Sequence, residues 1–262
     1  LGYQDEPYDA LLDEFEPGMV TSQVTTVFEA LRSDLVDLVG QIAKKPTIDE
    51  SILTRYYPEK AQWDLGVRVM GEVGYDFSRG PQDRSEHPFS TTFSVTDSRV
   101  TTHLNRHHFN PAFFGSLHEA GHAMYEQGVD QALDGTPLQD GTSLGIHESQ
   151  SRLWENLVGR SRPFWDRYFP VVQGYFPAAL SGVSAQEFYR AVNAVRPSLV
   201  RIEADEVTYN LHIMVRFELE RAMLSGEVKP ADLPEAWNAR MDEYLGVTPA
   251  TDSEGCLQDI HW

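Results

Sequence analysis

Apolar residues recur at helical spacing along most of this 262-residue chain. The pattern is clearest over residues 22–43, where Phe28, Leu31, Leu35 and Leu38 lie on one predicted helix face. Proline, glycine and capping residues bound several similar segments, so the same reasoning predicts helices over 58–73, 110–127, 146–159, 162–175, 185–195, 203–224 and 234–245. The pattern therefore indicates a mainly α, multi-helix fold.

A short stretch before the 110–127 segment is the exception to this helical pattern. Residues 90–95 and 99–104 are rich in Thr, Val and Phe, and a polar turn separates them, which predicts one small β-hairpin. Residues 134–145 are rich in Gly, Asp and Pro and are interpreted as a loop. No repeat or linker interrupts the chain, so we expect a single domain over residues 1–262.

Composition limits the classes of partner. The formal net charge is −19, which argues against nucleic acid and anionic membranes because little on such a surface would neutralise phosphate. Cys256 is the one cysteine, so an internal disulfide is excluded and a reducing cytoplasm is expected. The sequence has no apolar run near the roughly 20 residues that span a bilayer, and it opens without a signal-peptide pattern.

The segment His118-Glu119-Ala120-Gly121-His122 is an HExxH motif. Histidines four residues apart project from one helix face, so His118 and His122 can offer ring nitrogens to one metal ion. Glu119 would lie beside that ion, where it can take a proton from the attacking water and pass it to a leaving amine. A chance match on a solvated helix is the alternative, but the spacing favours a metal site.

A catalytic zinc ion usually has three protein ligands and keeps one position for water, so a third ligand is needed. Glu148 is the preferred candidate, because it stands near the start of the helix predicted to follow the HExxH helix after a loop. Its neighbour His147 is the competing ligand. Zinc is the expected metal, although Co and Mn also accept a His-His-Glu set.

Arg201 lies at the start of the long helix predicted over 203–224, where its side chain could face a groove. A guanidinium fork can hold both oxygens of a free peptide carboxylate. The alternative is a surface arginine that pairs with Glu203 or Asp205. The remaining histidines outside the motifs are interpreted as structural or solvated: His103, His107, His108 and His212.

Six segments together resemble, in order, the motif set of the thermostable metallocarboxypeptidases typified by carboxypeptidase Taq. They are His87-Pro88-Phe89, Asp97–Thr101, His118–His122, His147-Glu148-Ser149, Val200–Asp205 and Gly255–Trp262. The resemblance runs from about Tyr8 to the last residue. It implies a helical catalytic domain with a deep groove, one divalent metal, homodimers, and removal of C-terminal residues from peptides with a free C-terminus.

Carried over residue by residue, the resemblance implies that His118, His122 and Glu148 bind the metal and that Glu119 is the catalytic carboxylate. It also implies a substrate-binding set: His87, Arg99, Arg201 and His261. Members of the family have a further N-terminal helical region and a C-terminal segment, and this sequence has neither. The chain is therefore expected to be a fragment or a shortened version. Two alternatives stay open: an endopeptidase or aminopeptidase with the same centre, and a noncatalytic remnant whose metal joins two helices.

Overall fold

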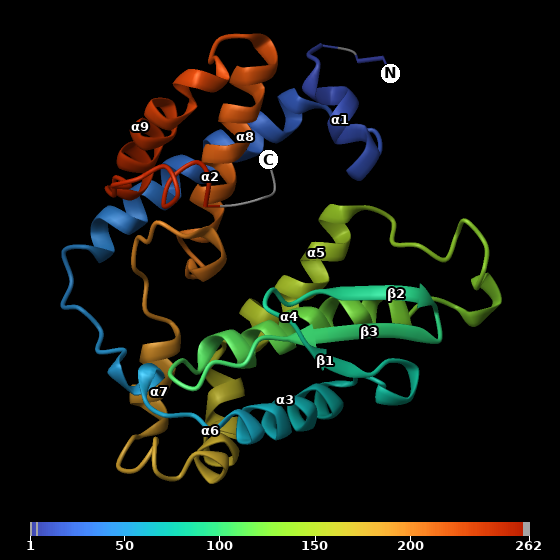
Figure 1. Ribbon diagram of the computed structural model, residues 1–262, viewed down its shortest axis with the longest axis vertical. Coiled ribbons are helices and arrows are strands. Elements are labelled where there is room, and N and C mark those ends of the chain that lie inside the picture. Colours follow the sequence, from blue (N-terminus) through green and yellow to red (C-terminus); the bar gives the residue numbers. More distant parts are fainter. Residues whose placement is uncertain (1, 4, 259–262) are drawn as a thin grey trace. The chain divides into compact units, whose positions relative to one another are not determined.

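A computed structural model describes residues 2–3 and 5–258, and it divides the chain into two compact units (Figure 1). Unit 1 comprises Leu1–Thr47 and Asn193–Trp262, and unit 2 comprises Ile48–Val192. The described residues are mostly helical with one small sheet, so the predicted fold class is confirmed. The assignment of one catalytic domain to residues 1–262 stays a prediction.

Unit 1 is a group of helices that pack around one apolar core. Its helices are α1 (Tyr8–Phe15), α2 (Thr21–Ile42), α8 (Tyr209–Ser225) and α9 (Leu233–Leu245). The core lies where α2, α8 and α9 meet, and its most deeply buried side chains are Leu211, Met214, Val215, Trp237 and Met241. The apolar faces predicted for these segments therefore point inward on α8 and α9.

The start of α8 differs from the prediction. We expected the helix from residue 203, but α8 begins at Tyr209, and a short 3₁₀ turn over Arg201–Glu203 precedes it. Ala204 has an extended backbone (φ −66°, ψ 145°). The Asp205 carboxylate then accepts the amide hydrogens of Val207 and Thr208, at 2.9 and 3.0 Å. This side chain competes with helical hydrogen bonding and delays the helix by six residues.

Unit 2 is built around the helix that carries the HExxH motif. Its helices are α3 (Glu59–Val73), α4 (Asn110–Gln127), α5 (Leu144–Arg152), α6 (Arg162–Tyr175) and α7 (Ala185–Val192), and a π-helical segment (Leu153–Val158) continues α5. The bounds of α4 are those predicted. α3, α5, the π-helical segment and the sheet all contact α4, so it is buried on most sides (Figure 1).

The sheet of unit 2 has the strand order β1-β3-β2. β2 (Ser90–Ser94) and β3 (Asp97–Thr102) form the predicted antiparallel hairpin, with Ser90 opposite Val100. β1 (Gln82–Arg84) adds a parallel strand on the other edge of β3 and was not predicted, because its three polar residues carry no strand signal. The buried hydroxyl groups of Thr102 and Ser116 lie 3.0 Å apart and join β3 to α4.

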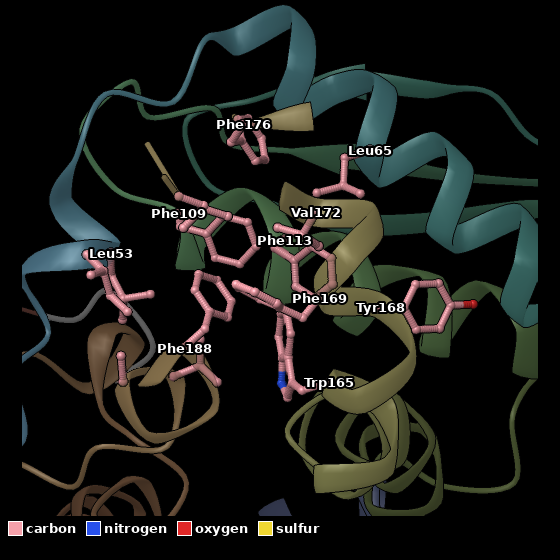
Figure 2. Close-up of a cluster of buried hydrophobic side chains, with 14 of the residues drawn as sticks. Leu53, Leu65, Phe109, Phe113, Trp165, Tyr168, Phe169, Val172, Phe176 and Phe188 are labelled. Atoms are coloured by element: carbon pink, nitrogen blue, oxygen red, sulfur yellow. The ribbon is translucent and has the colours of Figure 1, made fainter. Parts of the chain in front are cut away.

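An aromatic cluster holds the other side of α4 (Figure 2). Phe109 stacks on Phe113 with ring centroids 5.1 Å apart. Trp165 of α6 packs against Phe113 at 5.4 Å, and Phe188 of α7 packs against Trp165 at 4.8 Å. Such ring pairs add to the free energy gained by apolar burial, so this cluster fixes the position of α4 within its unit.

Candidate metal centre

His118, His122 and Glu148 converge in unit 2. The Nε2 atoms of His118 and His122 lie 3.6 and 3.2 Å from Oε2 of Glu148, and one ligand atom from each residue lies within 4.8 Å of the other two. Within residues 2–3 and 5–258, this is the one group of three His, Cys, Asp or Glu side chains with that spacing. The geometry therefore brings together the three residues predicted as ligands.

The donor set fits a divalent metal. Zinc bonds of about 2.0–2.2 Å in a tetrahedral arrangement place neighbouring ligand atoms about 3.3 Å apart. The two measured nitrogen–oxygen separations, 3.6 and 3.2 Å, lie close to this spacing. Two imidazoles and one carboxylate also match the open type of site that supports catalysis, since a structural zinc has four protein ligands.

The close approach of α4 and α5 depends on Gly121, the residue before His122. A Cβ atom at this position would lie 2.6 Å from both the carbonyl oxygen of Gln150 and the Cα of Ser151. Both contacts are with backbone, so no side chain could move to make room. The absence of a side chain at Gly121 therefore lets α5 lie against α4 and brings Glu148 to the two histidines.

Glu119 is buried beside the candidate ligands, with 6% of its surface exposed. Burial is the main cause that raises the pKa of this carboxyl group to about 7, and nearby Glu148 and Glu155 raise it further while His118 opposes them. A carboxyl group with a pKa near neutrality can both accept and release a proton, which is the property required of a general acid–base catalyst.

Two of the candidate ligands are held by further charged residues. Nδ1 of His118 lies 2.8 Å from Oε2 of Glu155, in the π-helical segment. Burial lowers the pKa of His118, but this hydrogen bond and the negative charges of Glu155, Glu148 and Glu119 together outweigh burial and raise the pKa above its usual value. Arg152 donates to Oε1 of Glu148 at 2.8 Å and to Glu155 at 3.0 Å. These contacts leave Nε2 of His118 and Oε2 of Glu148 facing each other.

Burial alone would raise the pKa of Glu148. The close contact with His122 and the charges of His118 and Arg152 outweigh burial and hold the pKa of Glu148 well below its usual range. The pKa of His122 is lowered, chiefly by burial. A negatively charged carboxylate beside a neutral imidazole is the protonation state in which both side chains can bind a cation.

His147, the competing third ligand, lies behind His122. Its Nδ1 atom is 2.6 Å from Nδ1 of His122, and its Nε2 atom is 2.6 Å from Oε1 of Glu126. Both ring nitrogens are therefore engaged in hydrogen bonds on the side of His122 that faces away from Glu148. This geometry favours Glu148 over His147 as the third ligand.

Sequence reasoning missed Glu126 and Glu155. A signal for Glu126 was present, because it follows His118 and His122 at the same four-residue interval and so continues their helix face. Glu155 lies seven residues after Glu148, a spacing that puts both on one face of the helix predicted over 146–159. The π-helical segment that carries Glu155 changes this spacing and could not be predicted.

The residues predicted to bind substrate lie in different parts of the chain. In unit 2, His87 is exposed before β2, and Arg99 on β3 makes two 2.8 Å hydrogen bonds to Asp97. Arg201 belongs to unit 1 and donates to the Tyr209 hydroxyl at 2.8 Å. His261 lies outside the described residues. The substrate-binding role of these four residues stays a prediction.

Two further expectations concern where the protein is located in the cell and whether it spans a membrane. Cys256 is buried and forms no disulfide within the described residues, and the cytoplasmic location expected from a single cysteine stays a prediction. Within the described part of the chain, each helix is too short or too polar to cross a bilayer.

Comparison with known proteins places these observations in a family. A family model described as carboxypeptidase Taq (M32) metallopeptidase matches residues 1–262. Thermostable carboxypeptidase 1 of Thermus thermophilus is 50% identical over 260 residues, which cover 98% of this chain and 50% of that protein. Carboxypeptidase 1 of Bacillus subtilis is 47% identical over 264 residues, which cover 100% of this chain and 52% of that protein.

The solved structures agree with the sequence comparison. An M32 carboxypeptidase from Deinococcus radiodurans R1 is similar with a TM-score of 0.96 at 48% identity, covering 99% of this chain and 52% of that one. The chain thus spans about half the length of the relatives that it matches. Because the family model matches it from end to end, the chain belongs to the carboxypeptidase Taq (M32) family of metallopeptidases.

Proposed function

We propose that this chain is a metal-dependent carboxypeptidase that hydrolyses the C-terminal peptide bond of peptides. The observation that carries the proposal is the convergence of His118, His122 and Glu148 beside the buried Glu119. The names of the relatives, carboxypeptidase 1 and thermostable carboxypeptidase 1, support the same class of activity. His118, His122 and Glu148 would hold one divalent ion, for which zinc is our first choice and Co or Mn are alternatives.

In the proposed reaction the metal ion would activate water and substrate, and the side chains of the protein would transfer the proton and hold the ligands. When bound, a divalent metal polarises the scissile carbonyl and lowers the pKa of water toward neutrality. Glu119 would take the proton of the attacking water and deliver it to the departing amine, two transfers for which its buried position beside the candidate ligands suits it. Glu155 and Arg152 orient His118 and Glu148 from behind.

Exopeptidase action also requires a group that binds the free carboxylate of the substrate. We assign this role to Arg201. The Tyr209 hydroxyl accepts a hydrogen bond from its guanidinium, and its main-chain N–H donates to Gln258 at 2.9 Å. These contacts fix the main chain and the guanidinium of Arg201 just before α8, and the planar fork of an arginine matches the two oxygens of a carboxylate.

Arg201→Ala is expected to lower kcat/KM on a peptide with a free C-terminus by about ten- to a hundredfold. This is the loss of a charge-assisted hydrogen bond worth roughly 1.5–3 kcal/mol. Metal content should not change. The measurement compares kcat/KM of the variant and the wild type on the free-acid peptide and on the same peptide amidated.

Arg240→Ala is the matched control, because Arg240 is a partly exposed arginine of unit 1 that pairs with Glu218 and Glu243. It should leave both rates near wild type. Equal losses for Arg201→Ala on the acid and on the amide would contradict carboxylate recognition by Arg201.

Peptide-cleavage assays of the wild-type chain distinguish a carboxypeptidase from the alternatives. A carboxypeptidase should release the last amino acid from an N-terminally blocked peptide whose C-terminus is free, and should fail on the amidated peptide. Cleavage of both peptides at an internal bond would indicate an endopeptidase. Release only from a peptide with a free N-terminus would indicate an aminopeptidase. Metal binding without release of any amino acid from either kind of peptide would indicate a noncatalytic remnant.

We also propose a homodimer. Several large apolar side chains of unit 1 are exposed on α1 and α2: Leu11, Phe15, Val27, Leu31 and Leu38. Exposed apolar patches mark surfaces that associate with another chain. Light scattering should give twice the chain mass of 29.6 kDa, and a monomer across a wide concentration range would contradict the prediction.

A further inference from the structure

His122 and His147 share a contact that constrains the hydrogens on both rings. Their Nδ1 atoms lie 2.6 Å apart, a separation that accommodates one hydrogen between them. Either His122 donates to His147 or His147 donates to His122. The choice decides which nitrogen of His122 keeps a free lone pair, because a neutral imidazole carries hydrogen on one nitrogen only.

Glu126 decides between the two arrangements. Its Oε1 atom lies 2.6 Å from Nε2 of His147, and a carboxylate can only accept a hydrogen bond. The hydrogen of His147 therefore lies on Nε2, and its Nδ1 is an acceptor. His122 must then donate from Nδ1. Two neutral imidazoles supply two hydrogens, and the two 2.6 Å contacts take them, so the longer 3.2 Å contact between Nε2 of His122 and Glu148 is left without one.

The position of the His147 ring is also fixed from its other sides. The Tyr125 ring packs edge-on against it, with centroids 5.3 Å apart and an interplanar angle of 87°. The backbone of the loop before α5 lies close to the ring, since a Cβ on Gly141 would meet Cδ2 of His147 at 3.0 Å. Glu126 is itself buried, with 8% of its surface exposed. The acceptor offered to His122 is therefore held in place.

We infer that His147 and Glu126 are positioning residues that hold His122 in the tautomer with hydrogen on Nδ1, so that Nε2 is free to bind a metal. The inference rests on the proposed function for the role of that metal. In the opposite tautomer a hydrogen on Nε2 would occupy the space beside Glu148. Loss of such a supporting partner typically lowers metal affinity by about 10- to 100-fold.

Histidine-ring ¹⁵N NMR of the chelator-treated chain reads the tautomers directly and needs no bound metal. We expect hydrogen on Nδ1 of His122 and on Nε2 of His147, and Glu126→Leu should remove this preference. Hydrogen on Nδ1 of His147 in the wild type would overturn the inference. This result does not depend on whether the chain hydrolyses peptides, so its failure is distinct from failure of the proposed function.

Zinc affinity measured by chelator competition gives the second test. His147→Leu should weaken binding by about 10- to 100-fold. His147→Asn should restore most of the loss, because Asn Oδ1 occupies the position of Nδ1 and accepts the same hydrogen bond. His107→Leu, which changes an exposed histidine of unit 2, is the control and should have no effect.

Each outcome of the affinity test decides the inference. Wild-type affinity in His147→Leu would overturn it. An equal loss in the Leu and Asn variants would also overturn it, because a histidine that bound the metal itself, or that only filled space, would not be replaced selectively by an acceptor. Absence of zinc binding by the wild type would refute the proposed metal site, and the NMR spectrum would still decide the tautomer.

Discussion

Glu119→Gln should keep the metal and lose at least about two orders of magnitude in kcat. The substitution preserves the size of a side chain that is 6% exposed, so α4 should fold as before. It removes the group that takes up the proton of the attacking water, because an amide does not accept protons near neutral pH. Steady-state rates on a blocked free-acid peptide, together with metal content by mass spectrometry, measure the two effects separately.

The control for Glu119→Gln is Glu72→Gln on α3. Glu72 pairs with Arg68 at 2.8 Å, and the side chains of both residues are partly exposed, so the substitution should leave kcat unchanged. If Glu119→Gln kept the wild-type rate, Glu119 would not be the general base. A loss of metal in this variant would instead assign Glu119 to the ligand set.

Gly121→Ala should weaken zinc binding by at least about tenfold, because the added methyl group collides with the backbone of Gln150 and Ser151 at 2.6 Å. α5 would have to move away from α4, and Glu148 would move with it, away from the position at which its oxygen lies 3.2 Å from Nε2 of His122. Overpacking should also lower the free energy of unfolding by about 1–3 kcal/mol. Chelator competition and denaturant unfolding measure these two losses.

The matched control is Gly115→Ala on the same helix. A Cβ on Gly115 would meet Cγ of Pro88 at 3.6 Å, an ordinary van der Waals contact. Replacing a glycine inside a helix should raise the free energy of unfolding by about 0.5–1 kcal/mol, with unchanged zinc affinity. Wild-type zinc affinity in Gly121→Ala would contradict the argument that this close approach positions Glu148.

Much of the helical framework was predictable because local signals agreed with the packing. The predicted bounds of α4 and α6 are those observed, and the Ser184–Glu187 capping box opens α7, with the Ser184 N–H donating to Glu187 at 2.8 Å. β1 was missed because Gln82, Asp83 and Arg84 have low strand preference, and their strand exists only through pairing with β3. The apolar pattern of α8 extends back to about residue 203, but the Asp205 side chain accepts the amide hydrogen of Thr208 and the regular helix begins only after it.

The candidate site was predictable only as far as spacing within one helix determines geometry. The four-residue interval brought His118 and His122 together on α4, and a downstream carboxylate was expected on the next helix. Whether Glu148 or His147 faces the two histidines depends on how α5 is rotated against α4. The tight contact at Gly121 determines that rotation. Glu155 approaches His118 through a π-helical segment that no periodicity in the sequence predicts.

Metal stoichiometry tests the central claim most directly. The chain should be stripped with chelator, dialysed against zinc and analysed by mass spectrometry, together with its His118→Ala variant and the His107→Ala control. We predict one zinc per chain for the wild type and for His107→Ala, and a large loss of zinc for His118→Ala. Equal zinc content in all three proteins, or no zinc in the wild type, would contradict a metal centre formed by His118, His122 and Glu148.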